Sequence, residues 1–323
     1  MRRLTLVSAL VAFGLLLGIA LILSASLSGT TSRAVALSAA VRGRSRQRPC
    51  PVLPANNPIN REIARAPVDP RSAQYIASTG PTLHLHADFG TNPTYGIPYA
   101  VVGPHQPKVP IDFTAYGPES DPGPYPIPPN ALVEGAGEEG DRHVLVLQKG
   151  VCRLYELYDA RRAGRGWAAD SGAVFDLRSN ALRPEGWTSA DAAGLPIFPL
   201  LARYDEVRTG RIDHALRVTV SRTQAGYIHP ATHYASSNSD PTLPPMGLRL
   251  RLSAGFDLSS YHGQALVILR ALKRYGLIVA DNGSSWYITG APDPHWSDAD
   301  LDQLKRVPGG AFEVVRSGPI RQR

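Results

Sequence analysis

The sequence predicts a mainly β fold, built as a β-sandwich or jelly-roll with a few covering helices, and an α+β fold is the alternative. Short segments in which apolar and polar residues alternate recur along the chain, as they do in half-buried strands. The chain also holds 29 prolines and 30 glycines. Such a composition favours short strands joined by rigid loops over long helices.

Alternating patterns predict the individual strands. Residues 143–148 and 151–158 flank Lys149-Gly150 and are expected to form a hairpin. A second hairpin is expected across Asn282-Gly283, because this pair suits the positive φ angles of a type I′ turn. Its strands are residues 277–281 and 284–289, and further strands are expected at residues 83–89, 215–220 and 246–252.

Few helices are expected, but their ends are well marked. Residues 261–275 place apolar side chains on one face, carry basic residues in the last turn and are followed by Gly276 as a stop. Thr188 with Asp191, and Ser297 with Asp300, match the capping box that opens a helix.

Residues 1–36 are interpreted as an export signal or a signal anchor. Two arginines precede residues 4–27, which carry no charge. This layout is typical of an export signal, and the apolar stretch is also long enough to span a bilayer as a helix. We therefore expect a body outside the cytoplasm, either secreted or membrane-anchored, with the membrane contacted only through this segment.

The positive charge of the chain is concentrated ahead of the body. Residues 1–71 hold ten arginines against Glu62 and Asp69, a balance of +8, so the formal total of +7 leaves the other residues at −1. We assign residues 37–71 to an Arg/Pro-rich linker and lead-in, and residues 72–323 to a single β-rich body. A near-neutral body lacks the basic stripe that a phosphate backbone requires, which excludes nucleic acid as the expected partner.

Cys50 and Cys152 are the two cysteines of the chain. In an oxidising compartment such a pair predicts one disulfide that ties the start of the body to its middle. Two unrelated thiols are the alternative. Neither cysteine belongs to a zinc-binding or CxxC pattern.

The most distinctive polar pattern lies in residues 83–89, where alternation places His84, His86 and Asp88 on one strand face. Two imidazoles and a carboxylate suit a metal ion such as Zn²⁺. They suit equally well contacts to sugar hydroxyls or proton transfer, and a plain solvated face is the third interpretation. The only cofactor left open is therefore a metal ion, since the chain lacks phosphate-loop and dinucleotide motifs.

Glu156 lies among apolar residues of the predicted strand 151–158, which is an unusual place for a carboxylate. Such a group needs a partner or a raised pKa, and raised pKa values concentrate at functional sites. Asp176 follows shortly after as a second carboxylate. Hydrolysis of a glycosidic bond requires two carboxyl groups, so this pair is the expected catalytic pair. A structural ion pair with an arginine is the alternative for Glu156.

A third cluster contains His233 and Tyr234. A neighbouring histidine and tyrosine can abstract a proton beside a uronic carboxylate, with Arg203 neutralising that anion. Trp187 is a candidate for stacking on a sugar ring. The alternatives are ligands that complete a metal site with His84 and His86, and an ordinary surface loop.

Several blocks spread over the body resemble a family of secreted bacterial proteins of uncharacterised function. They read HLHADFG, LYELYD, WTSADAAGLP, PPMGLRLR and YGLIVADNG. The resemblance implies a secreted protein associated with a wall or polysaccharide, and it assigns no catalytic residue.

Together these patterns predict an exported glycan-active enzyme, a glycoside hydrolase in preference to a polysaccharide lyase, whose partner is an extracellular polysaccharide or cell-wall polymer. The alternatives are a non-catalytic carbohydrate- or wall-binding module and a metal-dependent hydrolase that uses the strand of His84, His86 and Asp88. The expected catalytic residues are Glu156, Asp176 and His233. The expected substrate-binding residues are His84, His86, Asp88, Trp187, Arg203 and Tyr234.

Overall fold

Three mixed sheets carry the β structure of the computed structural model, which describes residues 50–137 and 140–322. The predicted export segment and residues 37–49 of the predicted linker lie outside these ranges. Within them, no helix has the length and apolar character needed to cross a membrane.

The largest sheet has six strands in the order β1 (His86–Asp88), β12 (Tyr287–Thr289), β9 (Leu216–Val220), β11 (Leu277–Asn282), β10 (Arg249–Leu252) and β13 (Phe312–Val314). Strand β1 runs parallel to β12, and β9 runs parallel to β11, whereas the other neighbours are antiparallel. The sheet therefore joins segments that are about two hundred residues apart.

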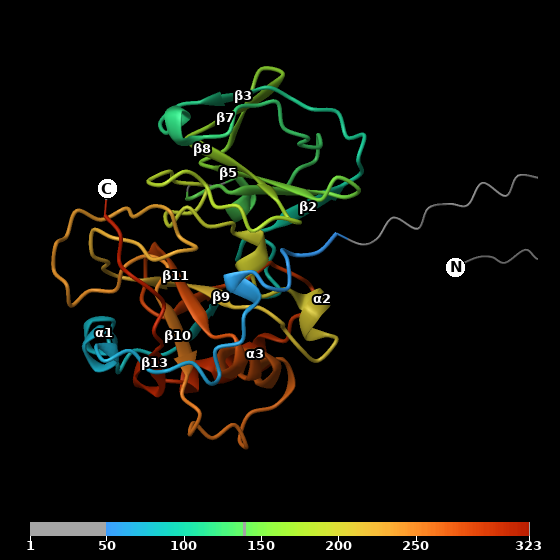
Figure 1. Ribbon diagram of the computed structural model, residues 1–323. Coiled ribbons are helices and arrows are strands. Elements are labelled where there is room, and N and C mark those ends of the chain that lie inside the picture. Colours follow the sequence, from blue (N-terminus) through green and yellow to red (C-terminus); the bar gives the residue numbers. More distant parts are fainter. Residues whose placement is uncertain (1–49, 138–139, 323) are drawn as a thin grey trace, which may run out of the picture. The chain divides into compact units, whose positions relative to one another are not determined.

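Two smaller sheets come from the middle of the chain (Figure 1, green). The four-stranded sheet has the order β2 (Tyr99–Val102), β4 (Val144–Gln148), β5 (Arg153–Tyr158), β8 (Ser171–Asp176). The three-stranded sheet has the order β3 (Ile111–Phe113), β7 (Gly166–Ala169), β6 (Arg161–Ala163). Strands β4 and β5 are antiparallel neighbours connected by residues 149–152, which confirms the first predicted hairpin.

Helices are short except for α3 (Gly263–Arg274), which confirms the helix expected at 261–275. Gly276 follows it with a φ of 73°, the left-handed conformation that ends a helix. The other α-helices are α1 (Ser72–Ser78), α2 (Tyr204–Val207) and α4 (Asp298–Asp302). The 3₁₀ turns are η1 (Pro58–Asn60), η2 (Gly117–Glu119), η3 (Glu134–Gly137), η4 (Phe198–Leu200), η5 (Gln303–Arg306) and η6 (Gly309–Ala311).

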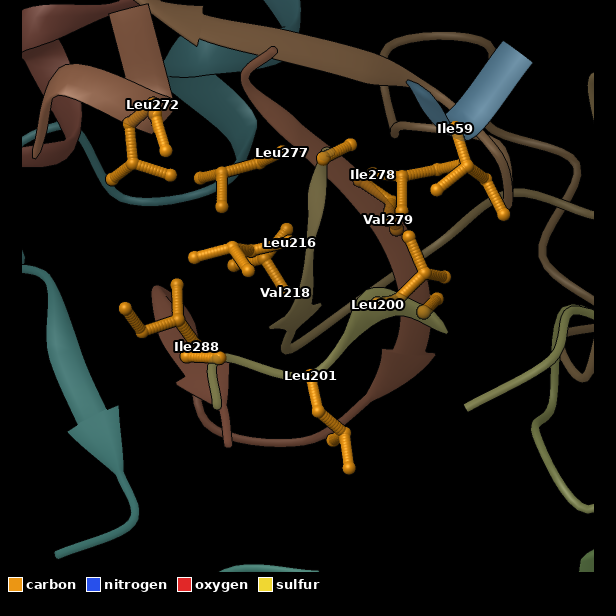
Figure 2. Close-up of a cluster of buried hydrophobic side chains, with 14 of the residues drawn as sticks. Ile59, Leu200, Leu201, Leu216, Val218, Leu272, Leu277, Ile278, Val279 and Ile288 are labelled. Atoms are coloured by element: carbon orange, nitrogen blue, oxygen red, sulfur yellow. The ribbon is translucent and has the colours of Figure 1, made fainter. Parts of the chain in front are cut away.

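The main apolar core forms where the six-stranded sheet meets α3, η1 and η4 (Figure 2). Fully buried aliphatic side chains from these elements pack together there, each contributing about 1.5–3 kcal/mol through burial. The labelled members are Ile59, Leu200, Leu201, Leu216, Val218, Leu272, Leu277, Ile278, Val279 and Ile288.

Cys50 and Cys152 are bonded, as predicted, with their Cα atoms 5.2 Å apart and a sequence separation of 102. The disulfide attaches the start of the lead-in to the turn between β4 and β5. It indicates an oxidising, extracytoplasmic setting for the body.

The predicted strands with a few helices are confirmed, and the described residues form a mixed α/β fold with three mixed sheets, among which neither the predicted sandwich or jelly-roll nor a closed barrel is shown. The second predicted hairpin is also wrong, because β9 lies between β11 and β12 and pairs with both. Local patterns locate strands, whereas contacts between distant segments decide which strands become neighbours.

The capping box at Ser297 and Asp300 is confirmed, since the Ser297 hydroxyl accepts a hydrogen bond from the Asp300 amide at 3.1 Å. The one at Thr188 is wrong. No helix follows Thr188, and the Asp191 amide donates instead to Ser189 Oγ within a turn. The Asp191 carboxylate therefore does not cap a helix and is available to another partner.

Candidate functional site

A polar cleft is the main candidate site, and it consists of two adjoining cavities of about 300 Å³ each. Asp141, Asp281 and Asn282 line both cavities. The first, here called the sheet cavity, is also lined by Asp88, Glu134, His143, Arg217, Thr219, Tyr287 and Thr289. The second, here called the tyrosine cavity, is also lined by Tyr116, Tyr158, Asp191 and His233.

The sheet cavity rests on a polar face of the six-stranded sheet. Strand β9 alternates buried Leu216, Val218 and Val220 with Arg217 and Thr219, so the two polar side chains share the opposite face.

Cross-strand pairing extends this polar face over the neighbouring strands. His86 lies opposite Tyr287, Asp88 opposite Thr289, and Tyr287 opposite Thr219. Directly opposed residues project from the same side of a sheet. The face therefore collects charged and hydroxyl groups from three strands.

A β-bulge places Asp281 on this face. The register between β11 and β9 shifts after Val279, so that Asp281 rather than Ala280 lies opposite Thr219. An extra residue in one strand reverses the side to which the following side chains point. Without the shift, Asp281 would project towards the apolar side with Val220.

Arg217 lines the sheet cavity and is almost completely buried. Its Nη2 atom lies 2.5 Å from Asp191 Oδ1 and 3.5 Å from Asp281 Oδ2, and its Nη1 atom donates to Thr289 Oγ1 at 3.0 Å. Burial opposes the charge of Arg217, but the two carboxylates outweigh it and raise the pKa of the guanidinium.

The pKa values of Asp191 and Asp281 are both raised, in each case chiefly by burial and against the attraction of Arg217. The close contact with Arg217 holds Asp191 as a carboxylate. Asp281 is a quarter exposed, so it is the member of this trio that a solute in the cleft can reach.

Asp88 is half-buried on β1 and shares a hydrogen bond with Tyr95. Burial is the main cause that raises the pKa of Asp88. The Tyr95 hydroxyl also lies 3.1 Å from His86 Nε2, and the His86 ring stacks on Tyr287 with centroids 4.3 Å apart. His84, by contrast, is exposed, and its backbone bridges to Pro308.

Three potential metal ligands, Glu134, Asp141 and His143, lie within 4.8 Å of one another in the described part of the chain. His143 Nδ1 lies 2.5 Å from Glu134 Oε2, and His143 Nε2 lies 2.9 Å from the carbonyl oxygen of Ala190. Since both partners are acceptors, both ring nitrogens must donate, and His143 has no lone pair for a metal.

The pKa values at this pair agree with its geometry. Burial lowers the pKa of His143, but the Glu134 carboxylate more than reverses this and raises it to about 9. Burial also opposes the charge of Glu134, yet the His143 imidazolium keeps the pKa of Glu134 below its usual value. The two residues form an ion pair that links η3 to the residue immediately before β4.

The structure does not bring Glu156 and Asp176 together. Glu156 has no accessible surface, and its carboxylate accepts hydrogen bonds of 2.9–3.0 Å from the amides of Ile197 and Phe198. Asp176 is exposed and pairs in register with Arg153, whereas Glu156 pairs with Ala173. Because Arg153 and Glu156 are three residues apart on β5, the two carboxylates project from opposite faces of the sheet.

His233 lies in the cleft, as one of the side chains lining the tyrosine cavity. Its Nδ1 atom donates to the carbonyl oxygen of Ala192 at 2.7 Å, so the neutral ring presents Nε2 as an acceptor. Tyr234 is half-buried and stacks on His233 with ring centroids 6.1 Å apart.

The other expected substrate-binding residues have structural partners. Arg203 is 2% exposed and is held by the carbonyl oxygen of Phe198 and the carboxylate of Glu206, each at 2.6 Å. Trp187 is half-buried beneath the Arg183 guanidinium. Neither residue lines the cleft.

Comparison of the chain with protein-family models, with curated proteins and with solved structures gave no match. The family resemblance inferred from the sequence blocks thus stays a prediction.

Sequence patterns missed Arg217, Asp191 and Asp281. The one usable signal was Arg217 itself, the only charge in the run 215–220, whose other residues are apolar except for Thr219. The patterns predict a hairpin strand for Asp281 and a helix cap for Asp191, and neither prediction indicates a site.

Proposed function

We propose that this protein is an exported glycoside hydrolase that acts on an extracellular polysaccharide or cell-wall polymer through carboxyl groups of the cleft. The observation that carries the proposal is the placement of Asp88 and Asp281, two accessible carboxyl groups that line one cavity together with buried Arg217. Burial raises the pKa of Asp88, as suits a general acid, whereas Arg217 opposes the same effect of burial at Asp281.

Asp88 is suited to the role of general acid. Its surroundings are partly desolvated, and Tyr95 fixes the orientation of its carboxyl group. In the proposed reaction Asp88 donates its proton to the departing glycosidic oxygen as the bond from that oxygen to the anomeric carbon breaks.

Asp281 is suited to the complementary role, because Arg217 lies 3.5 Å from it and favours its carboxylate form. This carboxylate either accepts a proton from the attacking water or attacks the anomeric carbon itself. In both cases one water is consumed and its hydroxyl bonds to the anomeric carbon. When Asp281 attacks the anomeric carbon, Asp88 takes the remaining proton of the water that later cleaves the intermediate. When Asp281 acts as the base, it holds that proton, and exchange with solvent returns a proton to Asp88.

Hydrolysis is supported better than elimination by a lyase. A lyase needs a free cation beside the uronic carboxylate of its substrate. Arg203, the expected cation, is enclosed by Phe198 and Glu206, and Arg217 is paired with Asp191. The cleft therefore has carboxylates for acid–base chemistry and lacks an uncommitted arginine along its described lining.

The test is the release of reducing sugar from a panel of polysaccharides. Asp88→Asn and Asp281→Asn should each lower the rate by about 10²–10⁴-fold, while Asp176→Asn, an exposed carboxylate outside the cleft, should match the wild type. Circular dichroism verifies the fold of each variant. If both cleft variants release sugar at the wild-type rate, the assignment is wrong.

The same panel separates the two alternatives. Retention of a polysaccharide on the wild type without any release of sugar would favour the non-catalytic binding module. Such a module would stack tryptophans on sugars, but Trp167 and Trp286 are buried. Stoichiometric metal in the purified protein would favour the metal-dependent hydrolase.

A further inference from the structure

The charged side chains that line the tyrosine cavity are predominantly negative. Asp141, Asp191 and Asp281 line it, and among the described residues no lysine or arginine does so. Arg217 approaches two of these carboxylates from the neighbouring sheet cavity. Three carboxylates against one guanidinium leave an excess of negative charge, which disfavours an anionic ligand and attracts a cation.

A separate feature of the cavity indicates that a hydrogen-bond donor is missing. Asp191 is 1% exposed, and its Oδ2 atom has no hydrogen-bond partner, although Oδ1 is held by Arg217. A buried carboxylate oxygen without a donor costs free energy. The Asp191 side chain is fully buried, so a solute in the cavity reaches Asp281 rather than Asp191 Oδ2, and the unpaired oxygen adds negative potential to the wall of the cavity.

The walls of the cavity suit a sugar ring. Tyr116 is 47% exposed and Tyr158 is half-buried, so both present aromatic surface to the cavity. Aromatic faces attract both ammonium groups and the apolar faces of small rings. His233 adds an acceptor nitrogen for a hydroxyl group. The volume of about 300 Å³ is at the lower end of the range for small-molecule pockets.

From these features we infer that the tyrosine cavity binds the ammonium group of an amino sugar, so that the preferred substrate is a cationic glycan with free amines. In this arrangement the accessible carboxylates of Asp141 and Asp281 accept N–H groups of the ammonium, buried Asp191 adds to the negative potential, and Tyr116 or Tyr158 lies against the ring. The inference rests on the proposed glycan-hydrolase function and specifies its substrate class.

Binding measured by calorimetry tests the inference without requiring catalysis. The probes are a glucosamine tetramer, its fully N-acetylated counterpart and a galacturonate tetramer, in weakly acidic buffer in which the amines are protonated. The glucosamine tetramer should bind at least about tenfold more tightly than the other two, and added salt should reduce this difference.

Three variants locate the binding. Asp141→Asn removes an exposed carboxylate of the cavity and should weaken binding of the glucosamine tetramer about fivefold, with little effect on the acetylated one. Tyr116→Ala should weaken the binding of both. Asp176→Asn is the matched control, since this exposed aspartate lies outside the cavity.

The possible outcomes separate the amine site from the hydrolase. Selective binding of the glucosamine tetramer without release of sugar from any polymer would support the amine site and reject the hydrolase. Release from a neutral or acidic glycan, with equal binding of all three tetramers, would reject the amine site and support the hydrolase. Absence of both binding and release would reject both.

Discussion

The carboxylate of Asp191 lies 2.5 Å from the guanidinium of Arg217, and both side chains are almost completely buried. The contact joins the loop after β8 to β9, an interior strand of the six-stranded sheet. A buried ion pair of this kind stabilises a fold only while both partners are present, because either one alone is an uncompensated charge.

Removal of one partner should therefore be strongly destabilising. Arg217→Met leaves Asp191 buried without its cation and should reduce the free energy of unfolding by about 3–5 kcal/mol, as measured by urea denaturation. The double variant Asp191→Leu with Arg217→Met should recover part of this loss, since no charge is left buried. A single variant as stable as the wild type would contradict the pairing.

Glu156 should prove to be a structural residue. In Glu156→Gln an amide NH₂ takes the place of one carboxylate oxygen that accepts hydrogen bonds from Ile197 and Phe198. We expect a loss of about 1–3 kcal/mol at neutral pH, with the folded protein keeping its catalytic rate. A rate falling by 10²-fold or more in a folded variant would restore Glu156 to the catalytic site.

The stability contribution of Glu156 should also depend on pH. Burial raises the pKa of Glu156 from 4.5 to about 7 in the folded protein, against the opposing effect of the Phe198 and Ile197 amides. A raised carboxyl pKa contributes stability below the unfolded pKa that is lost as pH rises through the folded one. The stability difference between wild type and Glu156→Gln should thus shrink between pH 4.5 and about 7.

The Glu134–His143 pair predicts a loss of stability at alkaline pH. The pKa of His143 rises from 6.5 to about 9 on folding, because Glu134 outweighs the effect of burial. The contribution of this ion pair to the free energy of unfolding is complete below pH 6.5 and is lost as pH rises through about 9. Such a shift corresponds to at most ~3 kcal/mol.

Chemical denaturation at a series of pH values measures this effect, with Glu134→Gln as the comparison. The free energy of unfolding of the wild type should exceed that of Glu134→Gln by the largest amount below pH 6.5, and this difference should become smaller as the pH rises through about 9. A difference in the free energy of unfolding that stays constant over this range would show that His143 is not held as an imidazolium.

The Cys50–Cys152 disulfide should be a major source of stability. It closes a loop of 102 residues, for which the chain-entropy estimate is about 4.7 kcal/mol. The double variant Cys50→Ser with Cys152→Ser should lower the melting temperature, and added reductant should have the same effect on the wild type. Reductant should leave the double variant unchanged.

Those parts of the fold that depend on local interactions could be predicted from the sequence. The β4–β5 hairpin and helix α3 were found because their periodicity and their glycine stops lie within a single short segment. Alternation also placed His86 and Asp88 away from buried Leu85 and Ala87. The disulfide followed from the presence of only two cysteines in an expected oxidising compartment.

The candidate site could be predicted only in part. Asp88 and His233 were selected and lie in the cleft, whereas Glu156 was selected for its unusual strand position and lies in the core. A carboxylate among apolar neighbours is equally compatible with catalysis and with a bond to buried amides. The residues that show which role Glu156 has are Ile197 and Phe198, and they lie about forty residues away in sequence.

The sequence by itself determined the local elements: the strand face that carries His86 and Asp88, the helix that ends before Gly276, and the pairing of two cysteines. Only the tertiary structure decided that Asp88, Arg217 and Asp281 share one cleft. The insertion of β9 between β11 and β12 and the bulge after Val279 bring these side chains together. Both features arise from pairing between distant strands, and no periodicity within a single segment records such pairing.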